Sequence, residues 1–117
     1  MTRAAFDHVS IHVSDLRRTR RFYERLGMEI LADEPGFLRI GGGDGFAIGV
    51  EERSPRDVGA PGLEIVIRVP DVDGLASSLR DEGVAVTAPS DQPSGARHAW
   101  LHDPDGYRLS IYSENAG

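Results

Sequence analysis

The residues of this chain that could do chemistry are four histidines and several carboxylates, since the sequence contains no cysteine. The histidines form two pairs, His8 with His12 and His98 with His102, in segments that alternate like β-strands. Imidazole is a common ligand of zinc, iron and nickel, so each pair suggests metal binding. Four strand residues separate two side chains by roughly 13 Å, however, so neither pair can chelate one ion. No Ser-His-Asp arrangement follows from the spacing either.

Two further motifs suggest chemistry but have a structural explanation. Asp103 and Asp105 resemble a carboxylate pair, yet Asp-Pro-Asp-Gly is typical of a tight turn. The glycine-rich run at 41–45 resembles a phosphate-binding loop, but it lacks the helix and lysine that should follow. Both motifs are therefore predicted to be turns between strands.

Composition narrows the class of partner. The 117 residues carry a net charge of −6 and a pI near 5.1, which argues against a nucleic-acid partner. One arginine cluster is expected to form a solvated helix face, and it comprises Arg17, Arg18, Arg20, Arg21 and Arg25. No apolar run approaches the length of a membrane helix, and the first residues do not resemble a signal peptide. We expect no membrane partner and a cytoplasmic protein.

The elements that must position these residues occur as an internal repeat, with two copies along the chain. Segments 6–15 and 62–71 both alternate apolar with other residues, as half-buried strands do. Each ends in an aspartate suited to cap a helix, Asp15 or Asp71. Helical spacing of apolar residues follows, and Gly27 or Gly83 then ends the helix.

Three strands are expected after each helix. They are predicted at 28–32, 37–41 and 46–51 in the first copy, and at 84–88, 97–102 and 107–112 in the second. The order βαβββ, repeated, predicts an α+β fold in which two tandem modules form a curved mixed sheet around a cup-shaped cavity. We expect a single domain over 1–117, with module one at 5–52, a linker at 53–61 and module two at 62–113.

Three stretches then resemble a known family. They are His8–Asp15 (HVSIHVSD), Arg21–Gly27 (RFYERLG) and Asp103–Ile111 (DPDGYRLSI). In this order and spacing they are similar to the vicinal-oxygen-chelate superfamily, the glyoxalase, bleomycin-resistance and dioxygenase group. The resemblance covers essentially the whole chain and implies the glyoxalase/bleomycin-resistance fold.

The resemblance also implies where a metal would bind. Metal-dependent members place ligands at the start of the first strand and within the last strand of each module. Those positions fall at His8 and Glu64, and at about Gly49 and Ser110. His8 and Glu64 can bind a divalent ion such as Zn, Fe, Ni or Mn, whereas Gly49 and Ser110 are poor ligands. Because catalytic zinc typically has three protein ligands, the set is incomplete and no cofactor is expected.

Strand alternation predicts which residues line the cup. Ala99, Leu101, Leu109 and Ile111 suit the helix-covered face. The opposite face and the cup are then lined by His8, Ser10, His12, Phe37, Arg39, Glu64, Val66, Arg68, His98, Trp100, His102, Arg108, Ser110 and Tyr112.

Several of these residues have a structural alternative to a functional role. His8 is either a hydrogen-bonded strand histidine or a ligand contact. Glu64 is expected to pair with an arginine or a histidine in preference to acting as a general base. Trp100 either packs or stacks on a ligand. His98 and His102 also suit the surface near a hairpin end.

Three functions remain open at this point. The preferred hypothesis is a small-molecule binding protein, of the antibiotic-sequestering kind, that takes a planar or polyfunctional ligand without a complete metal site. The alternative is a metal-dependent glyoxalase or lyase, epimerase, thiol transferase or extradiol dioxygenase. An accessory domain without a ligand is the third. By resemblance we also expect a homodimer, and Ser90–Gly95 is a candidate lid.

Overall fold

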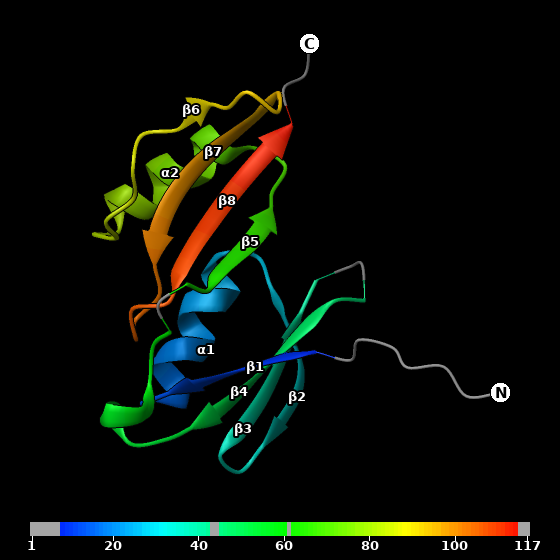
Figure 1. Ribbon diagram of the computed structural model, residues 1–117, viewed down its shortest axis with the longest axis vertical. Coiled ribbons are helices and arrows are strands. Elements are labelled where there is room, and N and C mark those ends of the chain that lie inside the picture. The colour runs from blue at the N-terminus through cyan, green and yellow to red at the C-terminus, as the bar shows by residue number, and fades with distance from the viewer. Residues whose placement is uncertain (1–7, 43–44, 61, 115–117) are drawn as a thin grey trace, which may run out of the picture. The chain divides into compact units, whose positions relative to one another are not determined.

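The computed structural model describes residues 8–42, 45–60 and 62–114. The chain divides into two compact units, Met1–Gly59 and Ala60–Gly117, and the division falls within the predicted linker (Figure 1). Each unit contains a helix and a four-stranded mixed sheet in the predicted order βαβββ. The predicted α+β class and the internal repeat are therefore confirmed.

The first unit forms a sheet with the strand order β1-β4-β3-β2 (Figure 1). Its elements are β1 (Val9–Val13), α1 (Leu16–Arg25), β2 (Glu29–Glu34), β3 (Phe37–Gly41) and β4 (Ala47–Glu52). β1 runs parallel to β4, and the other neighbours are antiparallel. Strands β3 and β4 thus form the hairpin predicted at the glycine-rich run, of which residues 43–44 lie outside the described residues.

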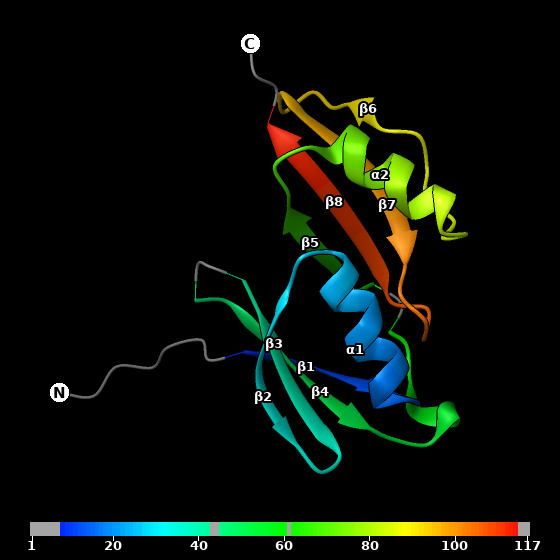
Figure 2. The same ribbon diagram turned by 180° about the vertical axis from the view of Figure 1, so that it is seen from behind.

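The second unit repeats this topology as β5-β8-β7-β6 (Figure 2). Its elements are β5 (Glu64–Arg68), α2 (Val72–Asp81), β6 (Ser90–Asp91), β7 (Ala96–His102) and β8 (Arg108–Glu114). β5 is parallel to β8, while β7 is antiparallel to both β8 and β6.

Local signals set the ends of both helices as predicted. The carboxylate of Asp15 accepts a hydrogen bond from the backbone N–H of Arg18 at 3.2 Å. Asp71 caps α2 in the same way, accepting from Gly74 N–H at 3.1 Å. After the helices, Gly27 and Gly83 take φ values of +94° and +89°, a left-handed conformation that favours glycine.

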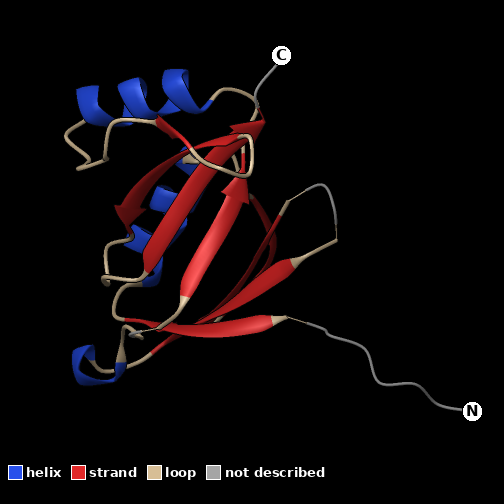
Figure 3. Ribbon diagram, turned by 45° about the horizontal axis from the view of Figure 1, so that its top comes forward, coloured by secondary structure: helices blue, strands red, loops and turns tan. Residues whose placement is uncertain are grey.

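Each helix covers one face of its own sheet (Figure 3). The core of each unit lies between its helix and its sheet. In the first unit, the buried residues include Phe22, Tyr23, Val13, Ile40 and Val50. In the second, they include Val72, Ala76, Leu79, Ala99, Leu101, Leu109 and Ile111. The last four are the residues predicted for the helix-covered face, so the alternation in β7 and β8 was interpreted correctly.

The prediction of a strand at 84–88 is wrong. This segment is irregular, with a single isolated bridge between Val86 and Leu101, and the sheet edge is formed instead by β6. The N–H of Trp100 donates to the side-chain Oγ1 of Thr87 at 2.9 Å, which interrupts a backbone ladder. Pro89 follows and has no N–H to continue it. The edge strand β6 therefore begins at Ser90, the residue after Pro89 and the first residue of the candidate lid.

The linker contains one 3₁₀ turn, Pro55–Asp57, in which the side chain of Ser54 accepts from the N–H of Arg56. Within the described ranges, no helix is long and apolar enough to cross a membrane.

Candidate functional site

The face of the second sheet opposite α2 carries most of the predicted site residues. Cross-strand pairing sets their register: Val66 lies beside Ser110, and Ser110 lies beside Trp100. Directly paired residues share a face because side chains alternate along a strand. We call this the polar face, and it comprises Glu64, Val66, Arg68, His98, Trp100, His102, Arg108, Ser110 and Tyr112.

Three aromatic rings are stacked on the polar face. The ring of His98 lies between those of Tyr112 and Trp100, with centroid distances of 5.0 Å and 5.5 Å. The interplanar angles are 13° and 22°, so the three rings are nearly parallel. A planar group can stack on the exposed faces of such rings.

A buried serine holds the central ring of this stack. The Oγ of Ser110 lies 2.6 Å from Nδ1 of His98, and Ser110 is fully buried. The bond sets the rotation of the imidazole, since a ring bonded at Nδ1 cannot turn about its Cβ–Cγ axis without breaking it. The polar face therefore presents a preformed aromatic surface.

Glu64 forms an ion pair within the polar face. Its Oε1 lies 2.8 Å from Nε of Arg108. The pairing expected for Glu64 with an arginine or a histidine is present.

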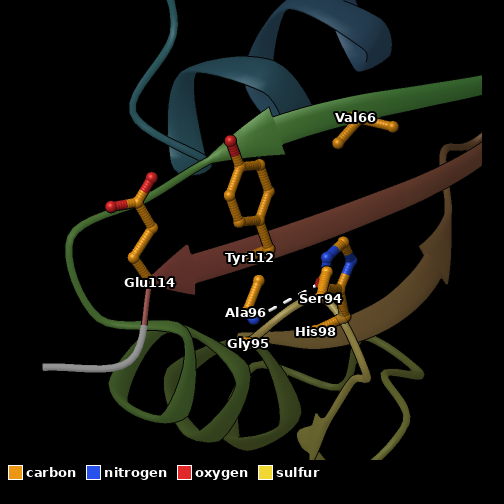
Figure 4. A pocket seen from close by; sticks show the side chains of 7 residues that line it. All are labelled: Val66, Ser94, Gly95, Ala96, His98, Tyr112 and Glu114. Atoms are coloured by element: carbon orange, nitrogen blue, oxygen red, sulfur yellow. Dashed lines mark hydrogen bonds between the residues drawn. The ribbon is translucent and has the colours of Figure 1, made fainter. Parts of the chain in front are cut away.

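A shallow pocket of about 540 Å³ opens beside Tyr112 (Figure 4). It is lined by Val66, Ser94, Gly95, Ala96, His98, Tyr112 and Glu114. Val66 is 53% exposed, which is high for a valine within a sheet. The volume is in the range of small-molecule sites.

Sequence reasoning missed four of these lining residues. Ser94, Gly95 and Ala96 lie where the candidate lid meets β7, and the N–H of Ala96 donates to Ser94 Oγ at 3.4 Å. Glu114 was missed because the last strand was predicted to end at 112, whereas β8 continues to Glu114. The alternation that placed Tyr112 on this face also places Glu114 there.

The equivalent face of the first sheet brings His8 to Gly49. A Cβ added at Gly49 would lie 2.9 Å from Cδ2 and 3.0 Å from Nε2 of His8, and 3.2 Å from Cε1 of Phe37. The absence of a side chain at Gly49 thus leaves space for the His8 ring. Ser10 and Arg39 flank Gly49 in the neighbouring strands.

His12 occupies a separate part of the same face. Its Nε2 lies 3.8 Å from Oε2 of Glu51, its cross-strand partner, and Glu51 also bonds Arg53. His12 thus lies beside Glu51, whereas the ring of His8 lies beside Gly49. On the second sheet, His102 pairs in register with Arg108 and is not part of the ring stack.

The Asp103–Gly106 motif forms a tight turn, as predicted. Oδ1 of buried Asp103 accepts from the N–H groups of Asp105 and Tyr107, at 2.9 Å and 3.0 Å. Gly106 has a φ of +90°, which suits glycine at this position. The carboxylate of Asp103 thus organises the β7–β8 connection.

The residues at the positions implied for a metal do not fit one. Glu64 pairs with Arg108, Ser110 bonds His98, and the ring of His8 lies where a side chain at Gly49 would begin. Among the residues that the structure describes, no three histidine, aspartate or glutamate side chains gather in a group able to hold an ion. A catalytic zinc or non-haem iron centre typically has three protein ligands.

Charged residues behind the polar face tie the candidate lid to α2. The guanidinium of Arg97 donates to both carboxylate oxygens of Asp73, at 2.8 Å and 3.0 Å, and to Asp91 of β6 at 3.2 Å. The bonds from Arg97 hold the pKa of Asp73 below its ordinary value, and the two carboxylates raise the pKa of Arg97 further.

Comparison with solved structures gives relatives over nearly the full chain. TnmS3, an antibiotic binding protein from Streptomyces sp. CB03234, is 29% identical, with a TM-score of 0.80 over 98% of this chain and 99% of that one. A glyoxalase/bleomycin resistance protein from the same organism is 31% identical, with a TM-score of 0.71 over 88% of this chain and 95% of that one. The bleomycin resistance determinant encoded on transposon Tn5 shares the fold at 24% identity, with a TM-score of 0.70 over 97% and 99% of the two chains.

A search of curated protein sequences gave no match. The family profile described as the Glyoxalase/Bleomycin resistance protein/Dioxygenase superfamily matches residues 5–111, which is almost the entire chain. The chain therefore belongs to the glyoxalase/bleomycin resistance protein/dioxygenase superfamily.

Proposed function

We propose that this protein binds a planar, positively charged small molecule on the polar face of the second sheet, and that it needs no metal to do so. The observation that carries the proposal is the Tyr112–His98–Trp100 stack, held by the bond from His98 to buried Ser110. A preformed aromatic surface binds a flat ligand at a low cost in conformational entropy. No ring in the stack has to be ordered on binding.

The pocket beside Tyr112 indicates the chemistry of the ligand. The outer face of Tyr112 offers stacking, exposed Val66 offers apolar contact, and Glu114 offers a negative charge. A planar cation satisfies all three, through dispersion, the ring quadrupole and ion pairing. The net charge of −6 raises the local concentration of such a ligand.

The independence from metal rests on what the implied ligand positions do instead. Ser110 positions His98, Glu64 pairs with Arg108, and Gly49 leaves space for the His8 ring. Each residue has a structural use that coordination of an ion would disrupt. This favours a binding protein over a metal-dependent enzyme of the same superfamily.

The description of one relative also supports a binding function. TnmS3 is described as an antibiotic binding protein, and it resembles this chain over nearly its whole length. We propose sequestration of an antibiotic as the specific role of the binding activity. In that role the protein would act in the cytoplasm, where it would lower the free concentration of the drug.

We further propose a homodimer. Strands β1 and β5 each have a single sheet neighbour among the described strands, and open edges favour pairing or cover. Sedimentation velocity at micromolar concentration should give twice the chain mass. A monomer at that concentration would contradict the dimer without affecting the binding proposal.

The binding proposal can be tested by comparing two variants in calorimetric titrations with a planar cation, 9-aminoacridine. We expect Tyr112→Leu to weaken binding by about tenfold, because a stacked aromatic pair contributes roughly 0.5–1.5 kcal/mol beyond its buried area. The matched control is Phe46→Leu, which removes an aromatic ring that is 58% exposed in the first unit and distant in sequence from the pocket. Equal effects of the two substitutions would contradict the proposal.

A further inference from the structure

A second pocket of about 580 Å³ lies at the other end of the ring stack, beside Trp100. It is lined by Arg80, Ala85, Val86, Thr87, Trp100, Leu101, His102 and Arg108. None of these residues lines the pocket beside Tyr112. The stack therefore separates two pockets in the second unit.

This pocket exists because the segment predicted as a strand at 84–88 is irregular. Only Val86 bridges to Leu101, and Thr87 exchanges two bonds with Trp100: its N–H donates to the carbonyl at 3.0 Å and its Oγ1 accepts at 2.9 Å. A regular edge strand would continue the sheet across this region. The irregular segment instead leaves an apolar recess against the side of β7.

The charged lining of the recess is of one sign. Arg80 and Arg108 contribute two guanidinium groups, and no carboxylate is among the residues that line the recess. This is notable in a chain with 19 acidic and 13 basic residues. Two guanidinium groups and an indole that line one recess favour an anion that carries an aromatic group.

Arg80 is positioned by weak bonds that leave donors for a ligand. Its Nε donates to the carbonyl of Val86 and its Nη2 to that of Thr87, both at 3.4 Å. A guanidinium has five N–H donors, so these two long bonds use a minority of them. A carboxylate would form shorter, charge-assisted bonds with the same group.

Arg108 is held from the opposite side by Glu64, with an Nε to Oε1 distance of 2.8 Å. This ion pair orients the guanidinium, but the carboxylate also offsets its positive charge. Glu64 thus competes with any anion that binds Arg108. Removing the negative charge of Glu64 should strengthen anion binding.

Trp100 supplies the aromatic wall. One face of its indole ring is stacked on His98, and its side chain also lines the recess. It is the only tryptophan of the chain, so its indole N–H gives a single resonance in a ¹⁵N–¹H correlation spectrum.

We propose that the recess beside Trp100 is a second binding site, selective for a small planar aromatic carboxylate whose ring contacts Trp100 and whose carboxylate bonds Arg80 and Arg108. The proposal does not depend on the function proposed above, because it concerns a different pocket and a ligand of opposite charge.

The test uses 1-naphthoate as the probe and neutral 1-naphthalenemethanol as its shape-matched control. Titration of the ¹⁵N-labelled protein should shift the Trp100 indole resonance with 1-naphthoate, in a saturable way, and much less with the alcohol. Equal shifts with the two compounds, or no shift at millimolar 1-naphthoate, would overturn the proposal.

Three variants assign the anion selectivity. We expect Arg80→Gln and Arg108→Gln each to weaken 1-naphthoate binding by about fivefold, the effect of losing one partly exposed charge-assisted contact. Glu64→Gln should strengthen it by about threefold, a gain that a merely structural role of Glu64 would not produce. Arg21→Gln, at an exposed site on α1 and with the same charge change as the two arginine variants, is the control. Affinities equal to that of the control in all three variants would contradict the assignment.

The same titrations distinguish a failure of one proposal from a failure of the other, because each pocket has its own NMR signal. The amide of Gly95 reports on the pocket beside Tyr112, whereas the indole of Trp100 reports on the recess. 9-Aminoacridine should shift the first signal and 1-naphthoate the second. If only one signal responds to its probe, only that proposal stands.

Discussion

Nδ1 of His98 and Oγ of Ser110 lie 2.6 Å apart, and this contact joins a buried serine to a half-buried ring on the polar face of the second sheet. Ser110 is buried among β5, β7 and β8, while His98 is half-buried between two aromatic rings. One polar contact thus sets the orientation of a three-ring surface. It also uses the serine at the position where the superfamily resemblance implies a metal ligand.

Removing this serine hydroxyl should destabilise the protein and loosen the stack. We expect Ser110→Ala to lower the free energy of unfolding by about 1 kcal/mol, because it leaves Nδ1 of His98 without its partner. Urea denaturation measures the change, and Ser77→Ala, at an exposed position on α2, is the control. A loss no larger than that of the control would show that the hydrogen bond does not hold the ring.

The contact between Gly49 and His8 predicts non-additive substitutions. Gly49→Ala places a Cβ 2.9 Å from the His8 ring, so the ring must move aside. We expect a destabilisation of about 1 kcal/mol that is largely removed in the double variant Gly49→Ala/His8→Ala. A double-mutant cycle by denaturation measures the coupling. Additive effects would mean that another neighbour, such as Phe37, sets the cost.

The N-cap of α2 should contribute measurably to stability. Asp71→Ala removes the acceptor for the Gly74 N–H, and we expect a loss of about 1 kcal/mol in the free energy of unfolding. Asp71→Ser keeps a capping oxygen and should recover most of it. If serine is as destabilising as alanine, the charge of Asp71 matters and the cap does not.

The ion pair between Asp73 and Arg97 predicts a dependence on pH. Because the folded state lowers the pKa of Asp73, the stabilisation is fully present above the ordinary aspartate pKa of about 4 and is lost as the pH falls through the lowered value. The difference in Tm between wild type and Asp73→Asn should be constant from pH 7 to 5. It should then shrink toward zero as the pH falls further. A difference that persists at pH 2 would exclude the carboxylate charge as its source, and Asp81→Asn on the same helix is the control.

The repeat, the helix caps and the helix-covered faces could be predicted because they depend on local signals. Asp15 and Asp71 cap their own helices, and Gly27 and Gly83 end them. These signals act within one or two turns of chain, so the sequence around them contains the whole explanation.

The candidate site was predicted only in part, because its contacts depend on register between distant strands. Alternation placed His98, Trp100 and Tyr112 on one face, but the stack requires that His98 pair directly with Tyr112. The false strand at 84–88 has the same cause: its residues suit a strand, and a side-chain bond from Thr87 to Trp100 replaces the ladder. Neither interaction is visible in a single local segment.

The central claim, that a planar cation binds without metal, is tested most directly by calorimetric titration of the chelator-treated wild-type protein with 9-aminoacridine. The account predicts a saturable isotherm with one site per chain, unchanged when zinc, nickel, manganese or iron(II) is added. An isotherm that appears only after stoichiometric metal is restored would favour a metal-dependent enzyme. No binding under either condition would contradict the assignment of the pocket beside Tyr112.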